Sequence, residues 1–210
     1  MTDNEKVVKS EGRGRWSYYS ESRRRQVSSV ILIFLLILGL IALIIWLVYR
    51  PHNPHFMVVA AAIYNLNTTS PTTVAATMQF TVFARNPNKR TSIHYDDLST
   101  YVTYHNQQLT VGVMLPPFSH ETKSTVALSP VLGGGMVPVS MDVANALMTD
   151  QANGIIGLKL IIEGRVRYKA GAIKTGHQDM VVKCDTVIGL KEGNGGQVPL
   201  LGYKDCDVDI

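Results

Sequence analysis

Hydrophobic and polar residues follow two different patterns in this chain, and the change falls near residue 50. Val30–Val48 is a run of 19 residues without a charge, a proline or a strongly polar side chain, and 16 of them are Leu, Ile, Val or Phe. A helix over 27–48 is about 33 Å long at ~1.5 Å per residue, which matches a hydrocarbon core of about 30 Å. The pattern therefore predicts a transmembrane helix over residues 27–49.

Two other structures contain apolar runs, namely a cleaved signal peptide and the core helix of a soluble protein. The apolar part of a signal peptide has about 7–15 residues and ends in small residues. This run is longer and ends in bulky and charged residues, Trp46-Leu47-Val48-Tyr49-Arg50-Pro51. A core helix normally has a polar edge, which this run lacks. We therefore expect a retained signal-anchor, with the aromatic rings at the interface and Arg50 among the headgroups.

The charges on either side of the run predict its orientation. Arg23-Arg24-Arg25 directly precedes the apolar segment, whereas only Arg50 lies close to its other end. Positive residues stay on the cytosolic side, so we expect the N-terminus in the cytosol and residues 50–210 outside or in a lumen. Residues 1–26 are polar, with almost nothing to bury, and are predicted to form a disordered basic cytosolic tail.

Beyond Pro51 the hydrophobic period is two, which predicts strands. In Thr77–Arg85 every second residue is apolar, from Met78 to Ala84. Gly164 interrupts the longest alternating segment and predicts a bulge or bend there. The remaining predicted strands are Ile93–Thr103, Gln108–Leu115, Lys123–Leu128, Leu158–Ala170 and Met180–Ile188.

One helix is predicted, at about Ser140–Gln151. Ser140 is a suitable N-cap, and Asn153-Gly154 ends the segment. Gly133-Gly134-Gly135, which precedes it, is predicted to be a flexible connection. Short strands with one crossover helix predict a mainly β fold over residues 50–210, an immunoglobulin-like or fibronectin-like sandwich.

Charge and cysteine content refine this assignment. The formal net charge is +4, yet residues 51–210 carry 12 basic and 12 acidic residues, so the excess belongs to the tail and Arg50. Nucleic acid is therefore not expected as a partner.

Cys184 and Cys206 either form a disulfide, which suits an oxidising compartment, or are two separate buried thiols. Asn67-Thr68-Thr69 is an N-glycosylation sequon.

Several motifs together resemble the plant NHL family of harpin-induced-like and non-race-specific-disease-resistance-like membrane proteins. They are Tyr49-Arg50-Pro51, Asn86-Pro87-Asn88 followed by Tyr95, Leu115-Pro116-Pro117-Phe118 and the Cys184 to Cys206 segment. The resemblance implies a late-embryogenesis-abundant (LEA) group 2 domain, a plasma-membrane location, a role in defence or abiotic stress and no enzymatic activity. The family often has Phe-Tyr-Gln where this chain has Phe118-Ser119-His120, and Ile155 follows Asn153-Gly154, so the Asn-Gly-Asp adhesion motif of one branch is absent.

The sequence contains no motif of a catalytic, cofactor or metal site, and none of these sites is predicted. His94 and Asp96 share a strand face, which is compatible with a weak cation site, although a solvated strand edge is the better explanation. Arg165, Arg167 and Lys169 would stand in a row about 7 Å apart on one face of a strand. This row is a candidate for an anionic ligand, or else an ordinary solvated sheet face.

The leading hypothesis is a non-enzymatic, single-pass protein of the plasma membrane that contacts protein partners, cell-wall components or a second copy of itself. Other secretory membranes or plasmodesmata are alternative locations. The main functional alternative is a lipid-binding or membrane-protecting module, in which the interior or the open end of the sandwich takes an acyl chain and which a real cavity would favour. A third is an ectoenzyme, which requires His94, Asp96 and Asp97 to cluster with another histidine in a pocket.

Overall fold

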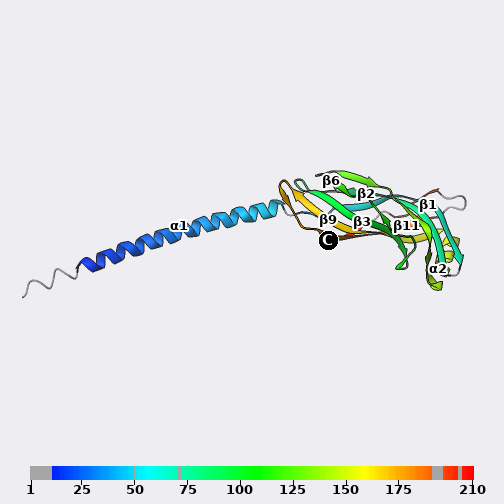
Figure 1. The fold of residues 1–210 in the computed structure, drawn as a ribbon, viewed down its shortest axis with the longest axis horizontal. Coiled ribbons are helices and arrows are strands. Elements are labelled where there is room, and N and C mark those ends of the chain that lie inside the picture. Colours follow the sequence, from blue (N-terminus) through cyan, green and yellow to red (C-terminus); the bar gives the residue numbers. More distant parts are fainter. Residues whose placement is uncertain (1–10, 50, 71, 191–195, 203–204) are drawn as a thin grey trace, which may run out of the picture. The chain divides into compact units, whose positions relative to one another are not determined.

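The computed structural model describes residues 11–49, 51–70, 72–190, 196–202 and 205–210 (Figure 1). The chain divides into two compact units, Met1–Arg50 and Pro51–Ile210. In the first unit the described residues form one helix, α1 (Glu11–Tyr49). The second unit consists of two antiparallel β-sheets and the helix α2 (Met141–Asn153).

Helix α1 contains the predicted apolar span. Residues 23–47 are long and apolar enough to cross a membrane, and none of the span is buried. The helix begins earlier than predicted. Residues 11–26, which were expected to be disordered, belong to α1, which begins at Glu11. Extending an existing helix adds one hydrogen bond per residue and avoids the cost of nucleation. Residues 1–10 of the predicted tail lie outside the described residues.

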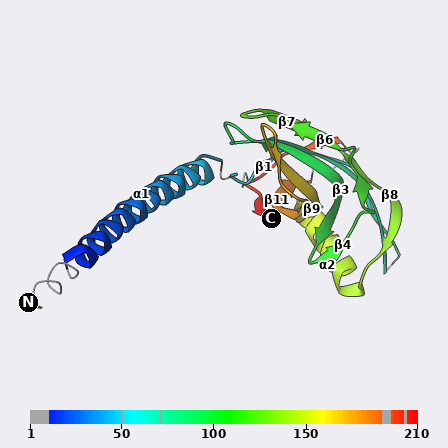
Figure 2. The same cartoon turned by 60° about the vertical axis from the view of Figure 1, so that its left-hand side comes forward.

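The first sheet has the strand order β12-β1-β2-β7, with β8 also paired to β2. The second has the order β13-β11-β9-β3-β4, with β5 and β6 on β3 and β10 on β9; β11, β9 and β3 are seen side by side in Figure 2. The bounds in the first sheet are β1 His55–Ser70, β2 Thr73–Arg85, β7 Thr125–Leu128, β8 Val131–Pro138 and β12 Gly196–Val198. Those in the second are β3 Ser92–Tyr104, β4 Gln107–Gln108, β5 Val113–Met114, β6 Phe118–His120, β9 Ile155–Ala170, β10 Ile173–Lys174, β11 Gln178–Gly189 and β13 Asp207–Asp209.

The core lies between the two sheets and follows the predicted alternation. In β2 the side chains of Met78, Phe80, Val82 and Ala84 are buried, and the exposed Phe83 points outward. From the facing sheet, β9 contributes Leu160 and β3 contributes Tyr95. The mainly β sandwich is therefore confirmed, because apolar residues at a period of two have one face of each sheet to bury.

Helix α2 connects the two sheets, as predicted for a crossover. It follows β8 of the first sheet and precedes β9 of the second. The Ser140 hydroxyl accepts a hydrogen bond from the Val143 amide, and Gly154 ends the helix with φ 72°. Leu147 is fully buried and attaches the helix to the core.

Two predictions for the sandwich were wrong, and the strand β1 was not predicted. Gln108–Leu115 is not one strand, because Leu109 and Thr110 are both buried, so that two consecutive residues break the alternation between β4 and β5. Gly133-Gly134-Gly135 is not a flexible connection but part of β8. Gly133 has φ +116°, and a Cβ there would lie 1.9 Å from the Ala76 carbonyl oxygen, so this strand requires glycine in order to approach β2.

The predicted irregularity at Gly164 is present, but the extra residues lie on its partner strand. The pairing of β3 with β9 shifts between Asp96 and Ser99. Leu98 enters the core at this bulge, and a Cβ on Gly164 would lie 2.7 Å from its Cδ2 atom. Gly164 therefore makes room for the bulge of the neighbouring strand.

Candidate functional site

The Asn86-Pro87-Asn88 motif forms a buried hydrogen-bond centre at the end of β2. The Asn86 amide nitrogen donates to the carbonyl oxygens of Thr91 at 2.9 Å and Glu121 at 3.0 Å. Its amide oxygen accepts from the backbone and side-chain nitrogens of Asn88 at 3.0 and 2.9 Å. One fully buried side chain thus connects the turn after β2 to the loop after β6.

Asn88 pairs with the backbone at the start of the second unit. Its amide nitrogen donates to the His52 carbonyl oxygen at 2.7 Å, and its amide oxygen accepts from the His52 amide at 2.8 Å. The side chain therefore substitutes for a peptide group of a neighbouring strand. In sequence, this attachment comes directly after the Tyr49-Arg50-Pro51 motif, of which Arg50 lies outside the described residues.

Three buried polar atoms have no hydrogen-bond partner among the described residues. They are the Tyr95 hydroxyl, the Tyr168 hydroxyl and the His120 Nδ1 atom. Burial lowers the pKa of His120, and the hydrogen bond from its Nε2 to the Ser124 carbonyl opposes part of this shift. Burial also raises the pKa of Tyr95 and raises the pKa of Tyr168 to about 12. This cluster is not visible in the sequence, because its members belong to three different strands.

The two cysteines are bonded to each other in the structure, as one of the two alternatives predicted. The bond attaches the C-terminal segment to β11. In that segment Asp205 bridges Met57 of β1, and the Cys206 amide donates to the Phe56 carbonyl oxygen at 2.9 Å. Because β13 then pairs with β11, the segment connects one edge of the first sheet to one edge of the second.

The remaining predicted positions are exposed. Asn67 lies on β1, opposite Ala75, with its side chain at the surface. Arg23, Arg24 and Arg25 lie on α1 and are exposed. These positions are thus accessible for the roles predicted for them.

The basic row on β9 is partly neutralised by neighbours on β3. Arg165 forms an ion pair with Asp97, and Arg167 forms one with Asp96 at 2.8 Å. His177 lies 3.6 Å from the same Asp96 carboxylate, whereas Lys169 has no ion pair among the described residues. The register of the two strands, which sequence does not reveal, places the aspartates beside the arginines.

The histidine and acids of the hypothetical cation site are occupied by protein contacts. The His94 Nδ1 atom lies 2.7 Å from the Ser119 hydroxyl, and both aspartates pair with arginines. Within the described part of the chain, no group of three His, Cys, Asp or Glu side chains has the arrangement of a metal site.

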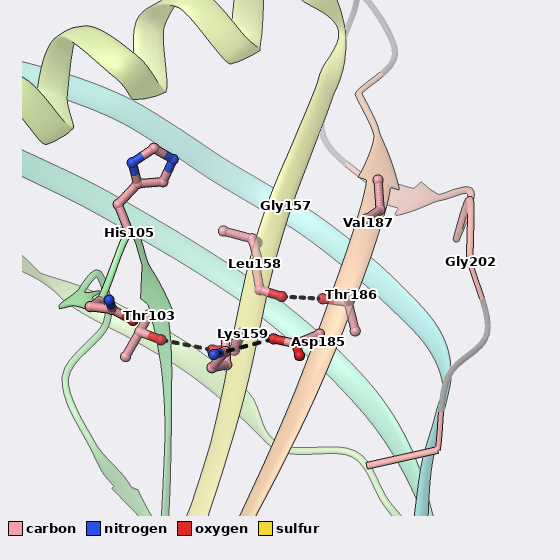
Figure 3. A pocket seen from close by; sticks show the side chains of 10 residues that line it. Thr103, His105, Gly157, Leu158, Lys159, Asp185, Thr186, Val187 and Gly202 are labelled. Carbon is pink, nitrogen blue, oxygen red and sulfur yellow. Dashed lines mark hydrogen bonds and ion pairs between the residues drawn. The ribbon is translucent and has the colours of Figure 1, made fainter. Parts of the chain in front are cut away.

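A groove of about 500 Å³ lies on the outer face of the second sheet, across β3, β9 and β11 (Figure 3). Its size is within the range of small-molecule pockets, roughly 300–1,000 Å³. The Lys159 ammonium lies 3.4 Å from the Asp185 carboxylate at the centre of the groove. His105 lies at one side and Val187 at the other. None of these residues was singled out by the sequence, because no motif connects them.

Comparisons with known proteins give a consistent result. A family model described as late embryogenesis abundant protein matches residues 81–185. NDR1/HIN1-like protein 12 of Arabidopsis thaliana is 33% identical over 191 residues, which is 88% of this chain and 91% of that protein. NDR1/HIN1-like protein 1 of the same plant is 35% identical over 141 residues, 66% of this chain and 68% of that protein.

A solved structure is described as the crystal structure of a protein from Archaeoglobus fulgidus. The alignment covers 64% of this chain and 98% of the chain in that structure. The TM-score is 0.34 and the sequence identity is 11%. The alignment is too distant to support any conclusion about fold or function.

Proposed function

Because this chain belongs to the NDR1/HIN1-like family and its second unit matches the late embryogenesis abundant domain, we propose that it is a non-enzymatic, membrane-anchored protein of plant defence or stress responses. Its sandwich is presented at the cell surface, where it contacts other molecules. The tail remains in the cytosol.

The observation that carries this proposal is the exposure of the apolar side chains of α1. Its Leu and Ile side chains are 49–67% exposed in the structure. Each exposed apolar side chain of this size costs roughly 1.5–3 kcal/mol in water relative to burial. Hydrocarbon removes that cost, so the bilayer is the partner that this helix requires.

The orientation rests on independent features at the two sides of the span. Arg23, Arg24 and Arg25 are exposed at its N-terminal end, and arginine crosses hydrocarbon at a cost of about 2.5–3.5 kcal/mol each. The disulfide and the exposed Asn67 of the sequon favour an extracytoplasmic sandwich. Among extracytoplasmic locations, we propose the outer side of the plasma membrane.

The polar residues of the sandwich support a role in binding and not in catalysis. An ectoenzyme would need His94, Asp96 and Asp97 free to act on a substrate, whereas Ser119 and two arginines occupy them. The lipid-binding alternative would need space between the sheets. Large side chains such as Phe56 and Phe80 are fully buried there, which favours a packed interior, and the groove lies on an outer face.

Fractionation of tagged full-length protein from plant cells tests the proposal. We expect the protein to remain in the pellet after alkaline carbonate, the N-terminal tag to be digested by protease added to the cytosolic side, and the C-terminal tag to be protected. Glycosidase should shift the wild type and the Asn65→Gln control, but not Asn67→Gln. A carbonate-soluble protein, or a C-terminal tag accessible from the cytosol, would contradict the proposal.

A further inference from the structure

The groove on the second sheet is built from two rows of residues that neighbour each other across three strands. Lys159 of β9 is paired in register with Thr103 of β3 on one side and Asp185 of β11 on the other. In the adjoining row, Gly157 is paired with Val187. The first row therefore contributes the polar side chains of the groove, and the second leaves bare backbone at Gly157 beside them (Figure 3).

Gly157 leaves a notch in the second row. A Cβ built at Gly157 meets no heavy atom within 4 Å, and its backbone is not in the left-handed region. The backbone geometry of this position therefore accepts a side chain, and the notch is open space above β9. Beside the notch, the exposed Val187 side chain provides an apolar surface, which suits the flat C–H face of a ring.

A strained turn forms the rim of the groove on the side away from Val187. His105 and Asn106 connect β3 to β4 with φ 47° and 63°, the conformation of a type I′ turn. The His105 ring stacks on the Tyr104 ring with centroids 4.3 Å apart, and the Tyr104 hydroxyl donates to the Asp150 carboxylate at 2.8 Å. The imidazole is thus supported by the core, although histidine is an uncommon residue at positive φ.

The polar groups of the groove are mixed in type and balanced in charge. Lys159 donates, Asp185 accepts and Asn106 can do both, whereas Thr103 can only accept, because its hydroxyl already donates to the Lys159 carbonyl oxygen at 3.3 Å. The ammonium and the carboxylate lie 3.4 Å apart, so that their charges compensate each other. An anionic ligand would meet the carboxylate of Asp185, and a lipid chain would leave both charges unsolvated. A hydroxyl group, which both donates and accepts, can bond to every member of this set.

We propose that this groove binds a neutral saccharide, whose ring lies over Gly157 while its hydroxyl groups bond to Lys159, Asp185 and Asn106. The proposal builds on the proposed function, since a domain at the outer surface of a plant cell is in contact with polysaccharides. It specifies the class of molecule that the surface contacts.

Binding of labelled oligosaccharides tests this proposal with the full-length chain in phosphatidylcholine nanodiscs. The probes are fluorescent neutral hexasaccharides of glucose, xylose, mannose or galactose, and an anionic hexasaccharide of galacturonic acid. Anisotropy is measured at about 0.05 M and about 0.3 M salt, because ionic binding weakens as salt screens the charges. The blocking variant is Gly157→Phe. Its matched control is Gly176→Phe, since Gly176 is likewise open and lies in the loop between β10 and β11.

We expect at least one neutral probe to bind with a Kd below about 1 mM, with little effect of salt. Gly157→Phe should weaken that binding at least about tenfold, because the ring fills the notch, whereas Gly176→Phe should leave it within about twofold. Asp185→Ala should weaken it several-fold through the lost acceptor. Equal melting temperatures of the variants would exclude misfolding as the cause.

Three results would overturn the proposal: no neutral probe binds below about 1 mM, the anionic probe alone binds, or Gly157→Phe binds as the wild type does. The measurement does not depend on membrane orientation. A failure here would leave the proposed anchoring intact, and a cytosolic sandwich in the protease experiment would leave the saccharide measurement intact.

Discussion

The two units of this protein use the same apolar residue types in opposite ways. The Leu and Ile side chains of α1 are 49–67% exposed, whereas the Leu and Ile side chains of the sandwich core are 0–8% exposed. The sandwich satisfies its apolar residues internally, because two sheets provide facing surfaces. A single helix has no such surface. The sandwich is therefore suited to fold in water, whereas α1 has the length and composition that suit hydrocarbon.

Charges placed in α1 should break this comparison most strongly. We expect Leu36→Arg together with Leu40→Arg to release the protein from membranes, since each arginine adds about 2.5–3.5 kcal/mol to the insertion free energy. The measurement is the fraction of full-length protein that resists carbonate extraction. The matched double variant with alanine at both positions should stay in the pellet. Retention of the arginine variant would contradict a membrane-spanning role for α1.

The same substitution placed in each unit sharpens the comparison. Leu160→Ala should lower the free energy of unfolding of the sandwich by about 2–5 kcal/mol, because Leu160 is fully buried between the sheets. Leu38→Ala, at a side chain 51% exposed on α1, should not change it. Denaturant unfolding followed by circular dichroism in the β region measures both. Equal effects of the two variants on the free energy of unfolding would contradict the conclusion that only Leu160 is packed inside the sandwich.

The disulfide should contribute the next largest effect. Replacing both Cys184 and Cys206 by serine should destabilise the sandwich by about 3 kcal/mol, since the bond constrains a loop between residues 22 apart in the unfolded chain. Dithiothreitol should destabilise the wild type equally and leave the double variant unchanged. An unchanged unfolding midpoint in the double variant would show that the strand pairing of the C-terminal segment suffices to hold it.

The Asn88 side chain should contribute less to the free energy of unfolding than the disulfide does, and its effect should be local to the His52 backbone. Asn88→Ala removes both hydrogen bonds to the His52 backbone and should cost about 1–3 kcal/mol. Faster hydrogen exchange of the His52 amide in the full-length protein is the local measure. Asn53→Ala, at an exposed neighbour in the same segment, is the control and should leave this exchange rate unchanged. Wild-type exchange in Asn88→Ala would contradict the pairing.

His120 should make the stability of the sandwich depend weakly on pH. Burial holds its pKa below the ordinary value of about 6.5, so the unfolded chain binds the proton more tightly. The contribution is therefore complete above about pH 6.5 and is lost as pH falls toward the lowered pKa, by at most about 1.4 kcal/mol per pH unit. Denaturant unfolding between about pH 5 and 7 should show this slope. His120→Gln should flatten it, and an unchanged slope in that variant would contradict the assignment.

Short-range spacing in the sequence was enough to predict several of the elements, although the long strand β1 (His55–Ser70) was not among them. The apolar run within α1, the period of two in β2, β3, β9 and β11, and the caps of α2 are all properties of neighbouring residues. The break between β4 and β5 was missed because Leu109 and Thr110 are fixed by contacts with Val102 on another strand. The glycines of β8 were misinterpreted because the close approach of Ala76 that requires them is a tertiary contact.

By itself, the sequence determined that one segment suits hydrocarbon and that the remainder forms a two-sheet sandwich, since both follow from the periodicity of apolar residues. Only the tertiary structure decided which distant residues meet. It placed Asp97 beside Arg165, bonded Asn88 to the His52 backbone and arranged Lys159, Asp185 and Gly157 around one groove. The physical reason is that strand register and sheet order, on which these contacts depend, are set by the packing of the whole domain and not by any local pattern.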